Sequence, residues 1–281
     1  MQDPKVFETN VKPTWCPGCG NYGIWMALKS ALVKLESMNH NTVIVYGVGC
    51  HGNMRDWMHV YGVEGLHGRA LPIAQGIKLA NSGLKVIAVV GDGDCIGEGG
   101  NHFIHAAKRN PNITVIIHDN EVYGLTTGQA SPTAQVGMET KSTPLGVMEP
   151  PMNPVSLALI SGATFVSRGF SGAIPQLTEL FMKAIKHNGF SVVDVLQPCV
   201  TFDKIHTYDW LRKRVYTLEN TPETFTDGIM KSFEWGEKIP LGIFQEIQKE
   251  TVEDREGVSK TPLITFPLGI PDREIFIRMF R

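Results

Sequence analysis

Two aspartates and two glycines follow an apolar run, and these residues are the first candidates for chemistry. Residues 86–90 are apolar and lead directly into Gly91, Asp92, Gly93 and Asp94. Such a run is typical of a strand buried on both faces of a parallel sheet, and glycines let the backbone turn sharply close to a ligand. Two carboxylates in one turn repel each other unless a cation is bound, so the pattern indicates Mg2+ with a phosphorylated cofactor. A plain turn with solvated aspartates is the alternative.

Five cysteines provide a second set of candidate ligands. Cys16 and Cys19 are separated by a Pro-Gly turn, so both thiols can face one metal centre; a redox pair and a zinc knuckle are the alternatives. Cys50 and Cys199 each follow an apolar run, whereas Cys95 lies inside the aspartate turn and is expected to be a small buried side chain. Five is an odd number of cysteines and few for a chain of this length, which argues against a disulfide framework and for a reducing cytoplasm.

Polar residues also follow the apolar run at 112–118, where Asp119 and Asn120 lie. A carboxylate at one strand end and an amide oxygen at the next can share one octahedral Mg2+, with a backbone carbonyl as a third protein ligand and diphosphate oxygens beyond it. Asp92 and Asn120 are therefore predicted to bind the same ion.

His67, Gly68 and Arg69 immediately precede a predicted helix at 70–81. A helix N-terminus favours anions and an arginine adds a bidentate fork, so Arg69 could meet a phosphate. A solvated arginine at the helix start is the alternative.

Strands and helices alternate along the chain. We expect strands at 41–46, 86–90, 112–118, 164–166 and 190–196, helices at 21–36, 70–81, 98–109, 155–161, 174–187, near 210–216 and at 225–235, and loops at 53–65 and 130–153. This alternation predicts an α/β fold with a doubly wound, mainly parallel sheet. Right-handed crossovers place the strand carboxyl ends at one edge, where ligands bind. Cys50, Asp92, Asn120 and Cys199 should converge there.

Composition narrows the class of protein. The chain has 281 residues, 42% of them hydrophobic, and a formal net charge of −2. This suits one large α/β domain or two small ones and indicates neither a nucleic-acid partner nor an anionic membrane. We expect no membrane segment, because no apolar run approaches the ~20 residues of a spanning helix. The first residues lack the pattern of a signal peptide.

The motif Gly91-Asp92-Gly93, followed about thirty residues later by Asn120, resembles the thiamine diphosphate motif. With further motifs, the chain resembles the beta subunit of 2-oxoacid:ferredoxin oxidoreductases over roughly residues 14–245. These motifs are Cys-Pro-Gly-Cys-Gly at 16–20, Gly-Cys at 49–50, His-Gly-Arg at 67–69, Tyr-Gly-Leu-Thr at 123–126 and Gln-Pro-Cys at 197–199. The resemblance implies a thiamine diphosphate-binding domain at 1–200 and, at 201–281, a C-terminal extension that packs on it and on the partner subunit.

The resemblance also implies residue roles. Asp92, Asn120 and the carbonyl of Val122 would hold Mg2+. The cofactor would contact Val48, Gly49, Cys50, His51, His67, Gly91, Gly93, Asp94, Gly124 and Leu125. One 4Fe-4S cluster would be held by Cys16, Cys19, Cys50 and Cys199. The candidate catalytic residues are His67, Arg69 and Thr127.

The implied reaction is oxidative decarboxylation of a 2-oxoacid, with coenzyme A taking the acyl group and ferredoxin the electrons. An alpha subunit would supply the second thiamine-binding domain, in an (alpha-beta)2 heterotetramer in the cytoplasm; gamma and delta subunits remain open. Some relatives have a lysine where this chain has Thr127, so recognition of the substrate carboxylate is left to the partner or to Arg55 and His51.

The residues 129–133 and the chain length most resemble the 2-oxoglutarate branch, with pyruvate and branched-chain 2-oxoacids as alternatives. Two other functions remain open. One is a non-redox thiamine lyase or synthase half with zinc at the four cysteines. The other is a non-catalytic assembly subunit, against which Asp92 and Asn120 argue.

Overall fold

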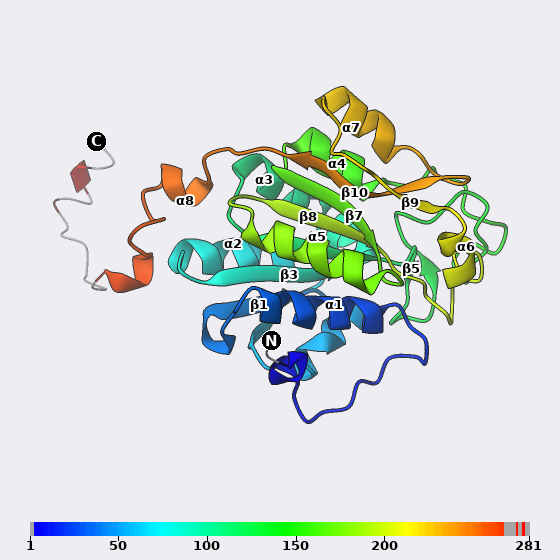
Figure 1. Cartoon of the computed structure of the whole chain (residues 1–281), viewed down its shortest axis with the longest axis horizontal. Coiled ribbons are helices and arrows are strands. Elements are labelled where there is room, and N and C mark those ends of the chain that lie inside the picture. Colours follow the sequence, from blue (N-terminus) through cyan, green and yellow to red (C-terminus); the bar gives the residue numbers. More distant parts are fainter. Residues whose placement is uncertain (1–2, 267–273, 275–276, 279–281) are drawn as a thin grey trace.

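The structure, a computed structural model, describes residues 3–266, 274 and 277–278. Eight strands of this described part form one sheet in the order β2-β1-β3-β4-β8-β7-β10-β9 (Figure 1). The strands are β1 (Thr42–Tyr46), β2 (Tyr61–Glu64), β3 (Lys85–Gly91), β4 (Thr114–Asp119), β7 (Phe165–Phe170), β8 (Ser191–Leu196), β9 (Val215–Thr217) and β10 (Ile239–Glu246). Two short strands, β5 (Val122–Tyr123) and β6 (Gln129–Ala130), form a separate antiparallel pair.

The main sheet is mostly parallel, which confirms the predicted α/β class. The pairs from β2 through β1, β3, β4 and β8 to β7 are all parallel. Strand β10 runs antiparallel to β7, and β9 is parallel to β10. Residues 215–246 therefore extend the same sheet that the first 200 residues build.

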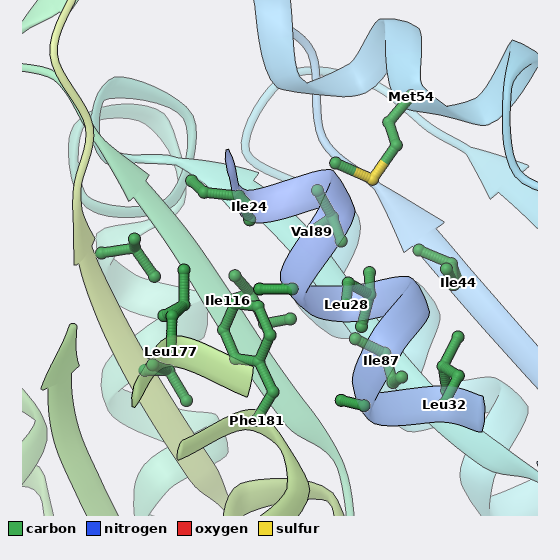
Figure 2. Close-up of a cluster of buried hydrophobic side chains, with 14 of the residues drawn as sticks. Ile24, Leu28, Leu32, Ile44, Met54, Ile87, Val89, Ile116, Leu177 and Phe181 are labelled. Atoms are coloured by element: carbon green, nitrogen blue, oxygen red, sulfur yellow. The ribbon is translucent and has the colours of Figure 1, made fainter. Parts of the chain in front are cut away.

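Helices cover both faces of the sheet. They are α1 (Asn21–Lys34), α2 (Ala70–Ala80), α3 (Gly100–Arg109), α4 (Pro154–Ser161), α5 (Ile174–Lys186), α6 (Tyr208–Arg212), α7 (Phe225–Ser232) and α8 (Val252–Arg255). Figure 2 shows α1 lying against the sheet through Ile24, Leu28 and Leu32, in a cluster that α5 also joins. Helices α2, α3 and α4 contribute to a second cluster.

Residues 86–90 of β3 are all apolar because both faces of this strand are covered. Ile87 and Val89 belong to the cluster with α1, whereas Val86, Ala88 and Val90 belong to the cluster with α2 and α3. Successive side chains of a strand point to opposite faces, so a strand covered on both faces loses the apolar–polar alternation. The run at 86–90 is thus a central strand, as predicted.

Two local predictions are wrong. The stretch 53–65 is not only loop, because β2 pairs with the edge of the sheet; all four of its residues are exposed, so no hydrophobic period marks it. Residues 215–217 form the short strand β9 rather than a helix. The turn predicted after β3 takes the form of a π-helical turn over Gly93–Glu98. The other predicted helices and strands are confirmed, with small differences at their ends.

A buried ion pair joins two neighbouring strands. Arg168 of β7 donates from Nε to Asp194 Oδ2 of β8 at 3.0 Å, and both side chains are almost completely buried. Burial raises the pKa of Asp194, and Arg168 opposes that rise. We expect Arg168→Met to lower the free energy of unfolding by about 3–5 kcal/mol, because it leaves Asp194 buried without its cation.

Urea-induced unfolding of the variant and the parent protein measures this difference. The double variant Arg168→Met/Asp194→Leu removes both charges and is expected to recover most of the loss. Equal stability of the single variant and the parent would show that the ion pair is not needed.

Candidate functional site

A cavity opens at the carboxyl ends of β1, β3 and β4. Its wall is made by loops that follow these three strands and by His67, which precedes α2. The lining residues are Val48, Gly49, Cys50, His51, His67, Gly91, Asp92, Gly93, Asp94, His118, Asn120, Val122, Tyr123, Gly124, Leu125 and Thr126. The cavity therefore lies at the sheet edge that the topology predicts for ligands.

Asp94 connects three of these segments through contacts of its carboxylate. Its Oδ1 accepts hydrogen bonds from the Val48 amide at 3.2 Å and the Gly68 amide at 2.8 Å. The same oxygen lies 2.7 Å from His67 Nδ1. One buried carboxylate thus positions the loop after β1, the segment before α2 and the turn after β3.

Three buried polar atoms of the cavity wall have no hydrogen-bond partner in the described part of the chain: Asp94 Oδ2, His51 Nε2 and His118 Nε2. Burial lowers the pKa of His51 to about 4 and that of His118 well below its usual value, so both rings are neutral at pH 7. Buried polar atoms normally have partners. His51 Nε2 and Asp94 Oδ2 lie 4.0 Å from each other, too far for a hydrogen bond. Polar atoms without hydrogen bonds around one cavity fit a polar ligand in it.

Two glycines leave no room for a side chain in the turn after β3. A Cβ at Gly93 would lie 2.3 Å from the Tyr123 ring, and one at Gly91 would lie 2.8 Å from the His51 ring. Both rings come from other lining residues of the cavity. Glycine at these two positions therefore allows the Tyr123 and His51 rings to pack directly against the backbone of the turn.

The candidate Mg2+ ligands lie at the ends of the neighbouring strands β3 and β4. Asp92 is buried, and its Oδ2 accepts hydrogen bonds from the Glu121 amide at 3.1 Å and from the hydroxyls of Ser131 and Thr133, both at 2.6 Å. Burial raises the pKa of Asp92, and the two hydroxyls oppose that rise.

The side chain of Asn120 is held in place by two hydrogen bonds. Its Nδ2 donates to Gln197 Oε1 at 3.2 Å, and its Oδ1 accepts from the Val122 amide at 3.1 Å. One carboxylate, one amide and one backbone carbonyl fit Mg2+, which uses few protein ligands and takes the rest from phosphate and water.

The four predicted cluster ligands are brought into one neighbourhood. The Gly20 amide donates to the Pro198 carbonyl at 3.2 Å, which joins the segment after Cys19 to the segment before Cys199. Burial raises the pKa of Cys19 to about 12 and that of Cys50 to about 11. Cys16 and Cys199 lie close enough to raise both values further.

Among the residues that the structure describes, no three His, Cys, Asp or Glu side chains are arranged as a metal site. Four neighbouring thiols are nevertheless a donor set that an iron–sulfur cluster or zinc accepts. Cys95 is buried elsewhere, in the cluster with α2 and α3.

Two predicted catalytic residues are not among the lining residues of the cavity. Arg69 is exposed, and its Nη1 points to the carbonyls of Gly68 and Glu98 at 3.4 and 3.5 Å. Thr127 follows the lining residue Thr126, and its hydroxyl accepts a hydrogen bond from Lys141 Nζ at 2.7 Å.

Three lining residues received no role from the sequence: His118, which was missed, and Tyr123 and Thr126, which were named only as part of a motif. His118 is the last residue of the apolar run before Asp119, so a histidine at a strand's carboxyl end was an available signal.

Comparisons with known proteins match two family models. The first, described as "Thiamine pyrophosphate enzyme, C-terminal TPP binding domain", matches residues 47–195. The second describes the C-terminal part of the beta subunit of pyruvate ferredoxin oxidoreductase and matches residues 199–261.

No described helix has the length and apolar character needed to cross a membrane.

Similar chains are known from several organisms. The 2-oxoacid:ferredoxin oxidoreductase subunit beta of Saccharolobus solfataricus is 43% identical over 88% of this chain and 86% of its own length. The 2-oxoglutarate synthase subunit KorB of Archaeoglobus fulgidus is 38% identical over 89% of this chain and 91% of its own length.

A solved structure of similar fold is the 2-oxoglutarate:ferredoxin oxidoreductase from Magnetococcus marinus with 2-oxoglutarate, coenzyme A and succinyl-CoA bound. It aligns with a TM-score of 0.91 at 33% identity, over 100% of this chain and 96% of that chain. With these similarities over nearly its whole length, the chain belongs to the beta subunits of the 2-oxoacid:ferredoxin oxidoreductases.

Proposed function

We propose that this chain, with an alpha subunit, catalyses the coenzyme A-dependent oxidative decarboxylation of 2-oxoglutarate to succinyl-CoA, with ferredoxin as electron acceptor. The observation that carries the proposal is the cavity in which Asp92 and Asn120 lie beside three unpaired buried polar atoms. The names of the Archaeoglobus fulgidus relative and of the Magnetococcus marinus structure support 2-oxoglutarate as the substrate.

The cofactor's phosphates would be bound at the end of β3. Asp92, Asn120 and the Val122 carbonyl would hold Mg2+, and Gly91, Gly93, Asp94, Gly124 and Leu125 would surround the diphosphate. When bound, thiamine diphosphate supplies the nucleophilic carbon and the electron sink that decarboxylation of a 2-oxoacid requires. The neutral rings of His51 and His118 would offer hydrogen-bonding atoms without adding charge.

His67 is the proposed proton carrier at the cavity wall. Asp94 lies 2.7 Å from its Nδ1, and a carboxylate at that position keeps a proton on Nδ1 and leaves Nε2 free to accept or return one. Val48, Gly49 and Cys50 would place the rest of the wall against the cofactor.

Electron transfer is assigned to the four neighbouring thiols. Cys16, Cys19, Cys50 and Cys199 would hold one 4Fe-4S cluster, which supplies one-electron transfer beside the cofactor. Because Cys50 lines the cavity, it belongs to both sites. A structural zinc held by the same thiols, in a non-redox thiamine enzyme, is the second candidate.

The proposal extends to assembly. Residues 201–266 of the predicted extension would pack on the first domain and on the alpha subunit, in an (alpha-beta)2 heterotetramer in the cytoplasm; most of the predicted extension beyond residue 266 lies outside the described residues. Three large apolar side chains, Phe225, Met230 and Phe233, are more than half exposed in and just after α7. Exposed apolar side chains gathered on one element are typical of a protein contact.

The first experiment is an anaerobic visible spectrum, with iron, sulfide, zinc and thiamine analysis, of the chain purified with its alpha subunit. We expect an iron–sulfur absorbance that bleaches when 2-oxoglutarate and coenzyme A are added. A colourless protein that contains zinc and thiamine would overturn the redox function and leave the non-redox enzyme.

A further inference from the structure

The cavity wall carries negative charge without a matching basic side chain. Its lining residues include Asp92 and Asp94 but neither lysine nor arginine. Mg2+ would compensate Asp92 and the phosphates. A 2-oxoacid with two carboxylates also brings a distal negative charge, and a carboxylate taken out of water needs a cation or several donors.

Arg55 and His51, which the sequence suggested as partners of the substrate carboxylate, are not placed to bind it. Arg55 is already compensated, because its guanidinium lies 3.0 Å from Glu64 and 3.6 Å from Asp56. The His51 ring is buried inside the wall, where a Cβ at Gly49 would lie 2.6 Å from it. A substrate's distal carboxylate would lie toward the cavity mouth rather than there.

Lys141 lies at the tip of a short hairpin turn. The backbones of Thr140 and Thr143 exchange two hydrogen bonds of 3.2 Å around it. The Ser142 hydroxyl accepts a bond from the Ala130 amide at 3.2 Å, which fixes the tip to β6. The lysine is exposed, yet its backbone is held in a defined place.

The side chain of Lys141 is bound to the residue that follows the lining segment of the cavity in sequence. Its Nζ donates to the Thr127 hydroxyl at 2.7 Å. Thr127 directly follows Leu125 and Thr126, which line the cavity, and Leu125 is 50% exposed. No carboxylate of the described residues lies within ion-pair distance of this ammonium group. Within the described part of the chain, Lys141 is thus a cation without a carboxylate partner, bound to the residue next in sequence to the cavity lining.

We propose that Lys141 binds the distal carboxylate of a dicarboxylic 2-oxoacid and so favours 2-oxoglutarate over monocarboxylic 2-oxoacids. This inference rests on the proposed function of the site. The carboxylate would lie beside the Thr127 hydroxyl, which keeps the ammonium group at the mouth when the substrate is absent. A lysine from another loop would thereby supply the charge that position 127 itself lacks.

The test compares two substrates of equal chain length. 2-Oxopentanoate matches 2-oxoglutarate except that a methyl group replaces the distal carboxylate. In the assembled complex, Lys141→Met is expected to lower kcat/KM for 2-oxoglutarate by about 10- to 100-fold, the range for one hydrogen bond to a charged group. The value for 2-oxopentanoate should stay within about twofold, because that substrate has no group for Lys141 to bind.

Matched variants separate charge from assembly. Lys141→Arg keeps the charge and is expected to retain most of the preference, while Lys186→Met removes an exposed lysine of α5 and should change neither value. If Lys141→Met does not assemble, Lys141→Gln gives the same comparison, because its amide can still donate to Thr127.

Each outcome decides one proposal. An unchanged ratio of the two kcat/KM values in Lys141→Met, or an effect confined to the KM for coenzyme A, overturns the role of Lys141 but leaves the proposed function intact. A parent complex that turns over no 2-oxoacid overturns the proposed function itself.

Discussion

Replacing Asp92 with asparagine is expected to abolish Mg2+-dependent binding of thiamine diphosphate and to lower turnover of 2-oxoglutarate by about a thousandfold or more. Asp92 is the carboxylate among the three proposed Mg2+ ligands, and the loss of a metal's contribution of about 4 kcal/mol corresponds to about three powers of ten. Thiamine and magnesium content of the purified complex, and release of carbon dioxide, measure the two effects.

The same variant should keep its fold. Three donors meet Asp92 at Oδ2, and an amide oxygen in that position can accept the same bonds. The thermal unfolding temperature of Asp92→Asn should therefore match that of the parent, which checks that the variant is folded. Asp56→Asn, the same change at an exposed aspartate outside the cavity lining, is the control and should leave cofactor content unchanged. Full cofactor content and activity in Asp92→Asn would rule out the proposed Mg2+ site.

The second large effect is expected for Cys199→Ser. If Cys199 is a cluster ligand, the complex should lose most of its iron and visible absorbance. Loss of a residue that only supports a metal ligand costs about 10- to 100-fold in activity. The rate of ferredoxin reduction should fall by more than that, because a ligand itself is removed. Thiamine content should stay near the parent value, because Cys199 is not among the residues that line the cavity.

Cys95→Ala is the matched control for this experiment. Cys95 is buried in an apolar cluster apart from the other four cysteines, so its replacement should cost stability but no iron. Equal iron content in Cys199→Ser and the parent complex would remove Cys199 from the ligand set. Zinc in place of iron in the parent would favour the non-redox alternative.

The central part of the site could be predicted because local pattern and topology agree there. An apolar run such as 86–90 predicts a buried parallel strand, and Gly-Asp-Gly at its end predicts a ligand turn. The parallel order of β1, β3 and β4 then brings Cys50, Asp92 and Asn120 to one edge without further information. These inferences need only the period of a strand and the handedness of its crossovers.

Other features depend on tertiary contacts that leave no local pattern. The exposed edge strand β2 has no hydrophobic period, and its pairing with β1 is set by the neighbouring strand. The contact between Lys141 and Thr127 joins two loops without regular sequence. The carboxylate of Asp94 could be placed at the turn, but not its bonds to Val48 and Gly68, which come from other loops.

The bonds of Asp94 constrain how the cavity wall can change in evolution or in the laboratory. Because this oxygen has partners in two other segments, a substitution that shifts either of them alters the setting of the other and of the turn itself, and the effects on stability are expected not to add. Exchange of the segment at 47–52 for that of a relative should therefore succeed only together with the segment at 67–68. The hairpin at 140–143 contacts Thr127 and Ala130 rather than the segments around Asp94, so its substitutions are expected to alter substrate range independently of those segments.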